Sequence, residues 1–229
     1  FRNCGKLTSL DLTAALAVGD EAFYGAKLTD LTAPVLREVG TRAFCSVPLT
    51  ALNLPALTTI GSYAFAQMSS LTTATLGPVT SMGSAVFNGS ARLASVSFAD
   101  GTTLVGDFAF YSLSNLATVT LPDSVKVIGD AAFAGTAITT VNLSGVTTVS
   151  DSAFAYCENL AAVDLSSAVT VGDLAFAATA LTSVHLPRAE AIGARAFSEA
   201  PITEATFGAI RTIGARAFYG TKLTTVTLP

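Results

Sequence analysis

The sequence predicts a repeat solenoid of mixed α/β type, mostly β, in one right-handed coil. Its core is one parallel sheet of about eleven short strands, with short helical turns on the return side. Two observations support this prediction. Similar residues recur every 21 to 23 positions, a period typical of solenoids. Each repeat also opens with an alternating apolar pattern, which indicates a short strand.

The repeat is clearest in the segment 116–137. There Val119 and Leu121 alternate with Thr118 and Thr120, so we expect the apolar pair to point inward and the threonines outward. Strands of successive repeats should pair in parallel, and the crossover between them should be right-handed. The repeats begin at Leu7, Leu28, Leu49, Leu71, Leu93, Leu116, Ile138, Leu160, Leu181 and Ile202, and an eleventh runs from Leu223 to Pro229.

The return leg of each repeat has two polar or flexible columns. The first is glycine in nearly every repeat, as at Gly129, which predicts either a positive φ or the close approach of the next repeat. The second holds residues that favour helix N-caps. We therefore expect a short helical turn near 130–134 that carries Phe133 inward. The second column reads Asp20, Thr41, Ser62, Ser84, Asp107, Asp130, Asp151 and Asp173.

One aromatic column accounts for most of the phenylalanines, and we expect it to form a stacked spine in the core. A single repeat buries too few apolar side chains to offset its own chain entropy, so the repeats must stack to fold. We expect one solenoid over residues 1–229, truncated mid-repeat at both ends and part of a longer protein. The column reads Phe1, Phe23, Phe44, Phe65, Phe87, Phe110, Phe133, Phe154, Phe176, Phe197 and Phe218.

These columns together resemble the BspA-like class of leucine-rich repeat, whose pattern runs L-x-x-I-x-I-P and then V-x-x-I-G-x-x-A-F-x-x-C. The resemblance covers the whole chain, although the cysteine after Phe remains only at Cys4 and Cys157. This class was first noted in surface proteins of bacteria and parasitic protists. The resemblance implies adhesion or protein recognition at a cell surface or after secretion. One repeat matches at Leu116, Val119, Leu121, Pro122, Ile128, Gly129, Ala132 and Phe133.

The outward strand positions are the candidate ligand-binding face. The face has no Lys, Arg, Trp, Tyr or Phe, whereas the residues that most often anchor protein interfaces include Trp, Tyr and Arg. A ladder of Ser and Thr also suits a sheet face that is merely solvated. Both interpretations stay open: a binding surface, or a merely solvated one. The candidates are Asp11, Asp30, Thr32, Asn53, Thr73, Thr75, Thr118, Thr120, Asn142, Asp164, His185 and Glu204.

Several chemical functions are not expected. The polar residues recur by column instead of converging from different elements, so we expect no enzyme activity and no cofactor. His185, the only histidine, should face solvent. The successive aspartates from Asp107 to Asp173 could form a Ca²⁺ ladder, but capping explains them without metal. The three cysteines are expected to be small apolar core residues.

Charge and hydropathy limit the classes of partner that this chain is expected to bind. The net charge of −4 argues against nucleic acid, and no apolar run is long enough to insert into a membrane. Residues 93–187 hold eight acids and one base, Lys126. Asn88-Gly-Ser is a possible glycosylation site, and Asn142-Leu-Ser also fits the pattern.

Two functions therefore remain. The first is a non-catalytic recognition or adhesion module that binds a protein of a host cell, a neighbouring cell or the matrix. The second is a structural spacer or scaffold, in which the sheet or a tyrosine-bearing edge packs on a fixed assembly partner. The edge carries Tyr24, Tyr111, Tyr156 and Tyr219.

Overall fold

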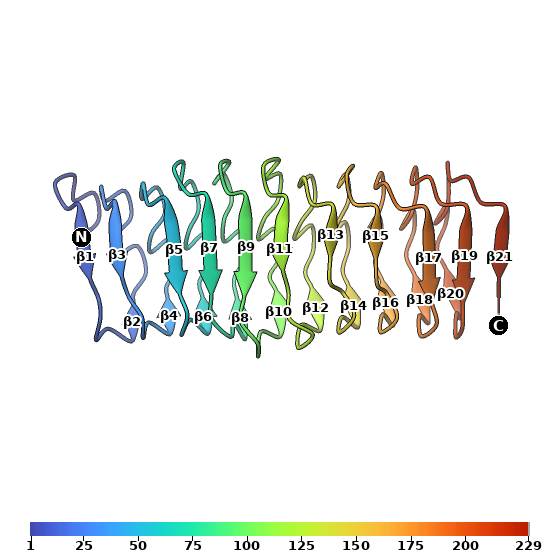
Figure 1. Ribbon diagram of the computed structural model, residues 1–229, viewed down its shortest axis with the longest axis horizontal. Coiled ribbons are helices and arrows are strands. Elements are labelled where there is room, and N and C mark those ends of the chain that lie inside the picture. The colour runs from blue at the N-terminus through green and yellow to red at the C-terminus, as the bar shows by residue number, and fades with distance from the viewer. Residues whose placement is uncertain (229) are drawn as a thin grey trace.

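The computed structural model describes residues 1–228 and is an elongated solenoid of about ten coils. Its strands lie side by side along the long axis, with the N-terminal and C-terminal coils at opposite ends (Figure 1). Pro229, the last residue of the repeat that opens at Leu223, lies outside the described residues. The predicted solenoid is confirmed.

The front sheet consists of eleven parallel strands, as predicted, divided into four hydrogen-bonded groups. Val119 and Leu121 are buried and the threonines beside them are exposed, so the predicted alternation is confirmed. The groups are β1 (Ser9–Asp11) with β3 (Asp30–Thr32); β5 (Ala51–Leu54), β7 (Thr73–Leu76), β9 (Ser95–Phe98) and β11 (Thr118–Thr120); β13 (Thr140–Val141) with β15 (Ala162–Val163); and β17 (Ser183–Leu186), β19 (Glu204–Phe207) and β21 (Thr225–Thr227).

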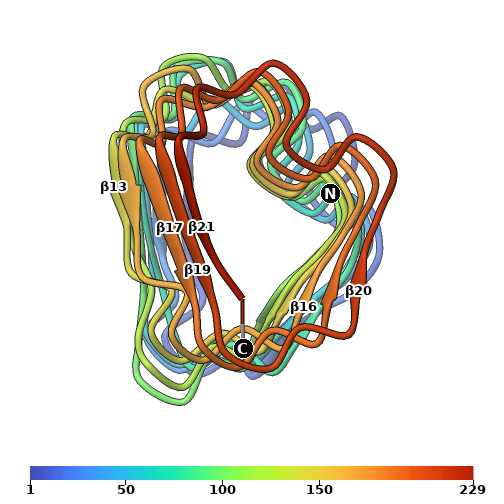
Figure 2. The ribbon, with the colours of Figure 1, turned by 90° about the vertical axis from the view of Figure 1, so that its right-hand side faces the viewer.

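The return side carries a second row of parallel strands, which the sequence analysis did not predict. Seen along the axis, the front strands form one side of each coil and the second row forms another (Figure 2). Each strand has only two residues, so its pattern is too short to stand out in the sequence. The row comprises β2 (Ala17–Val18), β4 (Glu38–Val39), β6 (Thr59–Ile60), β8 (Ser81–Met82), β10 (Leu104–Val105), β12 (Val127–Ile128), β14 (Thr148–Val149), β16 (Thr170–Val171), β18 (Ala191–Ile192) and β20 (Thr212–Ile213).

The predicted short helical turns are not formed; within residues 1–228 tight turns take their place. In the coil that contains Phe133, the N–H groups of Ala131, Phe133 and Gly135 donate to the carbonyls of the next coil at 2.8 Å. Both Ala131 and Gly135 have positive φ. A helix needs consecutive i→i−4 bonds, and here alternate donors leave the coil, so no helix can form.

These bonds between turns all run in one direction. In each coil that is followed by another turn, the turn donates N–H groups to carbonyls of the following coil, as in Phe108 N to Asp130 O at 2.7 Å and Ser152 N to Asp173 O at 2.7 Å. The bonds that directly follow the second row of strands run the opposite way, to the preceding coil: Gly129 N donates to Val105 O at 2.9 Å. We call the side of the molecule that carries the turns the turn edge. Its backbone hydrogen bonds between turns form a ladder in which all bonds run in the same direction.

The glycine column is explained by close approach and not by positive φ. A Cβ added to Gly129 would lie 2.7 Å from the backbone nitrogen of Asp107 in the preceding coil, closer than real Cβ atoms come. Its φ is not positive, whereas the residue two positions later, Ala131, has φ 47°. The glycines thus let successive coils approach, and other residues take the left-handed conformation.

The second return-leg column was wrongly assigned to helix N-caps. Its side chains accept hydrogen bonds from the same column of the next coil: Asp107 Oδ1 from Asp130 N at 2.9 Å, and Asp151 Oδ1 from Asp173 N at 2.8 Å. Ser62 Oγ likewise accepts from Ser84 N at 3.1 Å. The column therefore joins neighbouring coils by supplying acceptors for backbone N–H groups that the turns leave unpaired.

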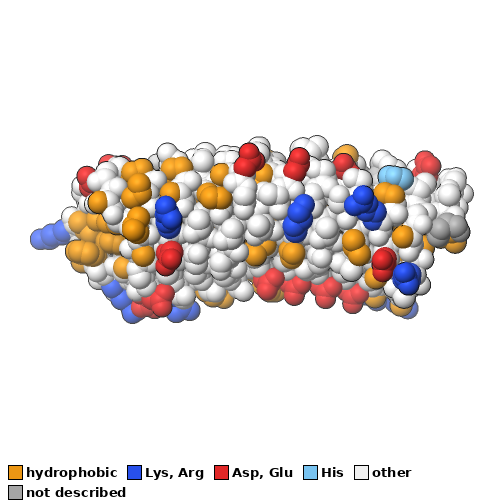
Figure 3. Space-filling model, turned by 90° about the horizontal axis from the view of Figure 1, so that it is seen from below, with side chains coloured by type: hydrophobic (Ala, Val, Ile, Leu, Met, Phe, Trp, Pro, Cys, Tyr) orange, Lys and Arg blue, Asp and Glu red, His pale blue; other side chains and the backbone are white. Residues whose placement is uncertain are grey.

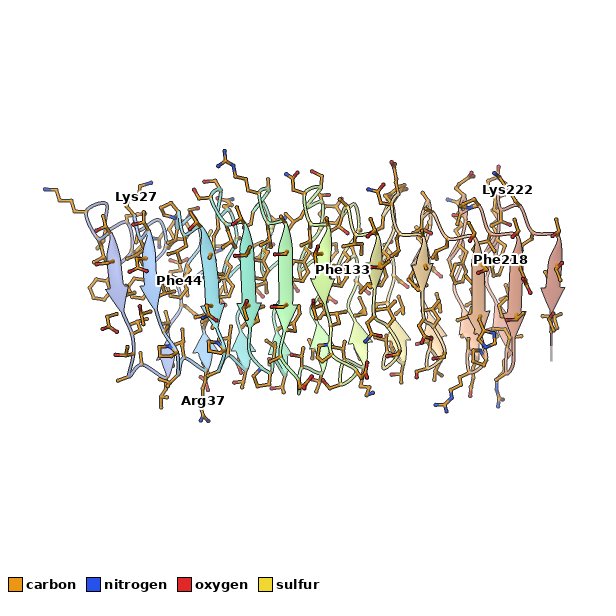
Figure 4. All side chains as sticks on the ribbon, in the orientation of Figure 1. Lys27, Arg37, Phe44, Phe133, Phe218 and Lys222 are labelled. Atoms are coloured by element: carbon orange, nitrogen blue, oxygen red, sulfur yellow. The ribbon has the colours of Figure 1, made fainter. Side chains whose placement is uncertain are left out.

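The phenylalanine column forms the expected spine. Consecutive rings are stacked with centroids 5.1 to 5.9 Å apart along the whole solenoid. Phe44, Phe133 and Phe218 mark its course in Figure 4. Two further rings, Phe98 and Phe207, meet the spine edge-on. Both arrangements suit the quadrupoles of aromatic rings, and the spine runs through a core shared by all coils.

The cysteines are free thiols, and two of the three are buried. Cys157 Sγ donates to Phe133 O at 3.1 Å, and burial raises the pKa of this thiol. The expectation of small apolar residues holds for Cys45 and Cys157, while Cys4 is half-buried. Within residues 1–228, no helix is long and apolar enough to cross a membrane.

Candidate functional site

The strand face, defined as the outward residues of the eleven front strands, is mostly polar. All twelve candidate residues on it are exposed. Strand pairing aligns them in rows: Asn53 pairs with Thr75, which pairs with Ser97, and that residue pairs with Thr120. Ser97 Oγ donates to Thr75 Oγ1 at 3.4 Å. The predicted ladder of small polar side chains is therefore formed along the middle of the sheet.

Three of the candidates already serve the backbone at the ends of their strands. Asp11 Oδ1 accepts from Thr13 N at 2.9 Å, Asn142 Oδ1 from Ser144 N at 3.1 Å, and Asp164 Oδ1 from Ser166 N at 2.9 Å. These are Asx turns, which the side chains of Asp and Asn favour. Their signal is visible in the sequence as Asp or Asn two residues before Ser or Thr. Asn53 cannot do the same because Pro55, two residues on, has no N–H.

Asn142 also belongs to a small polar cluster. Its Nδ2 donates to Asp123 Oδ1 at 2.8 Å, and Ser144 Oγ donates to the same oxygen at 2.9 Å. These two hydrogen bonds, and the charge of Lys126, lower the pKa of Asp123. The pKa of Asp164 is lowered as well, chiefly by its hydrogen bonds from Ser166. Both carboxylates are therefore held as anions.

His185 faces solvent from β17, as the sequence predicted. Its Nδ1 lies 2.6 Å from Thr206 Oγ1 on the neighbouring strand. Together with Glu204 these residues line a shallow hollow of about 260 Å³. The hollow is the most varied part of the strand face, since it combines an imidazole, a carboxylate and a hydroxyl. The other candidates on the face are Asp30, Thr32, Thr73 and Thr118.

The aspartate column does not form a metal centre within residues 1–228, where no group of three His, Cys, Asp or Glu side chains is arranged to hold a metal. Asp107, Asp151 and Asp173 each use one carboxylate oxygen to hold the next coil. Asn88 is half-buried in a turn, and the hydroxyl of Ser90 in the same Asn-Gly-Ser pattern is buried and donates to Phe65 O at 2.9 Å.

The turn edge carries a second candidate surface. Tyr156 is 62% exposed and Tyr219 is 60% exposed, while Tyr24 is half-buried beneath the Arg2 guanidinium. Sequence reasoning named these tyrosines but missed Phe108, which lies outside the aromatic column and is 45% exposed. Its ring meets Tyr111 edge-on at 5.9 Å. The sequence feature that could have identified Phe108 is its position directly after Asp107 of the aspartate column.

A hollow of about 480 Å³ lies between these rings, and we call it the turn groove. The aromatic rings of one coil form one wall, small residues of the next coil form the floor, and Tyr156 forms the opposite wall. Three alanines in it form a hydrophobic cluster separate from the main core. The groove is lined by Phe108, Tyr111, Ser112, Ala131, Ala134, Gly135, Ser152, Ala155 and Tyr156.

Three leucine-rich repeat proteins are among the solved structures that are similar to this chain. One from Bacteroides ovatus is 20% identical, with a TM-score of 0.48 over 96% of this chain and 78% of its own. A leucine rich cell surface protein from Faecalibacterium prausnitzii is 25% identical, with a TM-score of 0.49 over 81% and 68%. A leucine rich repeat protein of T. pallidum is 23% identical, with a TM-score of 0.47 over 57% and 77%.

The sequence itself gives the family. No curated protein matches the chain significantly. The family model for the BspA type leucine rich repeat region, however, matches six copies over residues 1–104, 80–201 and 190–229, which together cover the chain. The columns of apolar residues, glycine and phenylalanine described above are the positions at which the coils repeat. The chain belongs to the family of BspA type leucine rich repeat proteins.

Proposed function

We propose that this chain is a non-catalytic recognition or adhesion module of a cell-surface protein, and that it binds a protein of a host cell, a neighbouring cell or the matrix through the strand face. The observation that carries the proposal is the character of this face: the outward positions of the eleven front strands are mostly polar and exposed, and within each hydrogen-bonded group they lie in register. Leucine-rich repeat proteins commonly bind proteins. The family resemblance supports a surface or secreted setting.

The strand face offers specificity more than strong anchors. Its side chains are small, and several are held by hydrogen bonds to their own chain, so binding would cost little side-chain entropy. The varied hollow at His185 and Glu204 is the part of the face best suited to select a partner, because a complementary group could be recognised there by both charge and hydrogen bonding.

The test is a set of substitutions at exposed side chains for which the described residues show no hydrogen bond: Asp30→Ala, Asn53→Ala and Glu204→Ala. Binding of the purified chain to intact cells and to immobilised matrix proteins should fall in the triple variant. Glu38→Ala on β4, in the second row of strands, is the matched control and should bind normally. Unchanged binding of the triple variant would contradict the proposal.

The second candidate function is a structural spacer or scaffold. The continuous core and the inter-coil ladders favour it, because they make a stiff body of fixed length. A scaffold would be recovered from its source with a fixed partner in constant stoichiometry, and the triple variant of the strand face would keep that partner while showing no role in cell binding. Recovery of the chain free of any fixed partner would argue for recognition instead.

A further inference from the structure

The turn groove has the features of a docking site for an apolar side chain. Its floor is made of alanine and glycine, its walls are aromatic, and no charged residue lines it. Phe108 is 45% exposed and Tyr111 44% exposed, so both rings have faces without a packing partner in the chain. Exposed aromatic side chains next to a small-residue floor are the arrangement in which protein interfaces place their anchors.

Tyr156 stands in a conformation that its side chain does not favour. Its φ is 60°, and the equivalent position has a positive φ in every coil: it is glycine four times, at Gly25, Gly89, Gly135 and Gly220, and a non-aromatic residue such as Ser46, Gln67 or Ala178 in the others. A large L-residue there is strained, and the ring gains little burial in return. Tyr156 nevertheless borders three adjoining hollows, including the turn groove. The left-handed conformation is a property of the repeat, and what distinguishes Tyr156 is a large, exposed aromatic ring at a position that other coils fill with glycine or with non-aromatic residues.

The charge beside the groove determines what can enter it. The groove residues Phe108, Ala131 and Ser152 each follow an exposed aspartate in the chain: Asp107, Asp130 and Asp151. Figure 3 shows acidic side chains in a row along one edge of the middle coils. Tyr156 also borders two further hollows: Glu158 lines one, and Arg195, Arg216 and Glu199 line the other, which lies toward the C-terminal coils.

The aspartates beside the groove form no ion pair among the described residues. Within residues 1–228 the ion pairs are formed by Glu21 and Glu190, which lie outside these coils. Lys126, the one base between residues 93 and 187, donates to the carbonyls of Asp123 and Gly145 at 3.2 and 3.0 Å. The middle of the turn edge therefore combines an empty apolar slot with uncompensated carboxylates.

We propose that the turn groove binds a cationic segment of a partner protein, which inserts an aliphatic side chain between Phe108, Tyr111 and Tyr156 and places lysine or arginine against the aspartate row. The apolar slot supplies the anchor, and the carboxylates select the sign of the partner's charge and speed its approach. The proposal goes beyond the function proposed above, because it concerns a different face of the molecule and names the chemistry of the partner.

The experiment measures the binding of labelled synthetic peptides by fluorescence anisotropy at low and physiological ionic strength. The probe is a short peptide of alternating lysine and leucine; its controls replace every lysine by glutamate or every leucine by serine. We expect the probe to bind at least about tenfold more tightly than either control, and its affinity to fall as salt rises. Equal binding of the glutamate or the serine peptide would overturn the proposal.

Two variants localise the site. Tyr156→Gly removes the ring and relieves the strained backbone, so it should leave the melting temperature unchanged or raise it while weakening probe binding about tenfold. Tyr63→Gly is the matched control: it has φ 58° on the same edge, lies outside the groove, and should bind the probe normally. Equal loss in both variants, or in neither, would overturn the assignment to the groove.

The charge is tested with Asp130→Asn combined with Asp151→Asn. Asparagine keeps the oxygen with which Asp151 accepts the N–H of Asp173, so the coils should remain joined. Probe binding should weaken and lose most of its salt dependence. The same charge change on the strand face, Asp11→Asn with Asp164→Asn, should have no effect; an equal loss there would show that net charge alone attracts the probe and would overturn the proposal.

Light scattering decides whether a second copy of the chain occupies the groove. A monomer that binds the probe supports the proposal, whereas a dimer that Tyr156→Gly dissociates would overturn it. The failure of this proposal is separable from failure of the strand-face function, because the triple variant of the strand face leaves the groove intact and the groove variants leave the strand face intact.

Discussion

The strand face and the turn groove are both exposed, yet their side chains relate to the fold in opposite ways. On the strand face the side chains are small, and several, such as Asp11 and Asp164, accept hydrogen bonds from their own backbone. In the groove, large rings such as Tyr156 stand exposed on a strained backbone. The first surface contributes to the stability of the coil, whereas the second costs stability and is available to a partner.

The difference follows from where each surface lies in the repeat. A strand position must alternate with a buried one, so its residue is restricted to types that suit a pleated sheet. A turn position outside the core has no such restriction, and the residue there can differ from coil to coil. Large aromatic side chains are therefore found at exposed positions of the turn edge, while the outward strand positions hold mostly small polar residues, with His185 and Glu204 as exceptions.

The largest expected effect contrasts two phenylalanines of the turn edge. Phe133→Ala removes a fully buried ring of the spine and should lower the free energy of unfolding by about 3 to 5 kcal/mol. Phe108→Ala removes a half-exposed ring of the groove and should lower it by less than about 1 kcal/mol. Chemical denaturation measures both. Equal losses would break the distinction between the core and the groove.

The next contrast concerns two glycines. Gly129→Ala should destabilise the protein by about 1 to 3 kcal/mol, because the new methyl group would meet backbone atoms of the preceding coil that cannot move away. Gly135→Ala has room for its methyl group, 3.6 Å from Ser112, but a φ of +70°, and should cost about 1 kcal/mol. Thermal unfolding distinguishes the two, and a larger loss for Gly135→Ala would contradict the close-approach explanation.

A smaller effect is expected at the aspartate column. Asp151→Ala removes the acceptor for Asp173 N and should cost about 0.5 to 1.5 kcal/mol. Asp151→Asn keeps an acceptor oxygen and should be nearly neutral. Urea titrations of the two variants provide the comparison. If the asparagine variant were as unstable as the alanine variant, the carboxylate charge and not the hydrogen bond would join the coils.

The smallest effect is the pH dependence of the strand face. The folded-state pKa of Asp164 lies below its ordinary value of 3.8 because Ser166 donates hydrogen bonds to the carboxylate. Its stabilisation is complete above that value and is lost as the pH falls through the lowered pKa. As the pH is lowered from 4, the free energy of unfolding should therefore fall less in Asp164→Asn than in the unmodified chain. Urea titrations at a series of pH values below 4 would show this.

Much of the fold could be predicted because the same pattern recurs in every repeat, so an ambiguous secondary-structure assignment in one repeat is resolved by the others. Ten versions of one strand pattern identify the inward and outward residues, and the phenylalanine column gives the spine. The turns could not be predicted in the same way. The side chains of Asp, Ser and Thr accept hydrogen bonds equally well from the N–H groups at a helix start and from those of a neighbouring coil. Only the stacking distance between coils decides which N–H group is the donor, and for Asp107 it is that of the next coil.

The candidate surfaces were predictable to different degrees. The strand face follows from the alternation of its residues, so all twelve candidates lie where expected. Their Asx turns were readable at Asp11, Asn142 and Asp164 but were not recognised. The turn groove depends on which residues meet across adjacent coils: Phe108, Ala131 and Tyr156 belong to three successive repeats. No pattern within a single repeat contains that juxtaposition.

The unidirectional ladder of the turn edge has an electrical consequence. Each peptide group in a hydrogen-bonded row carries a dipole, and dipoles that point the same way add. Since each turn that is followed by another donates to it, the dipoles of the turn edge sum along the axis with their positive end toward the C-terminal coils. An α-helix has its positive end at the N-terminus, so this edge of the solenoid is polarised in the opposite sense to a helix.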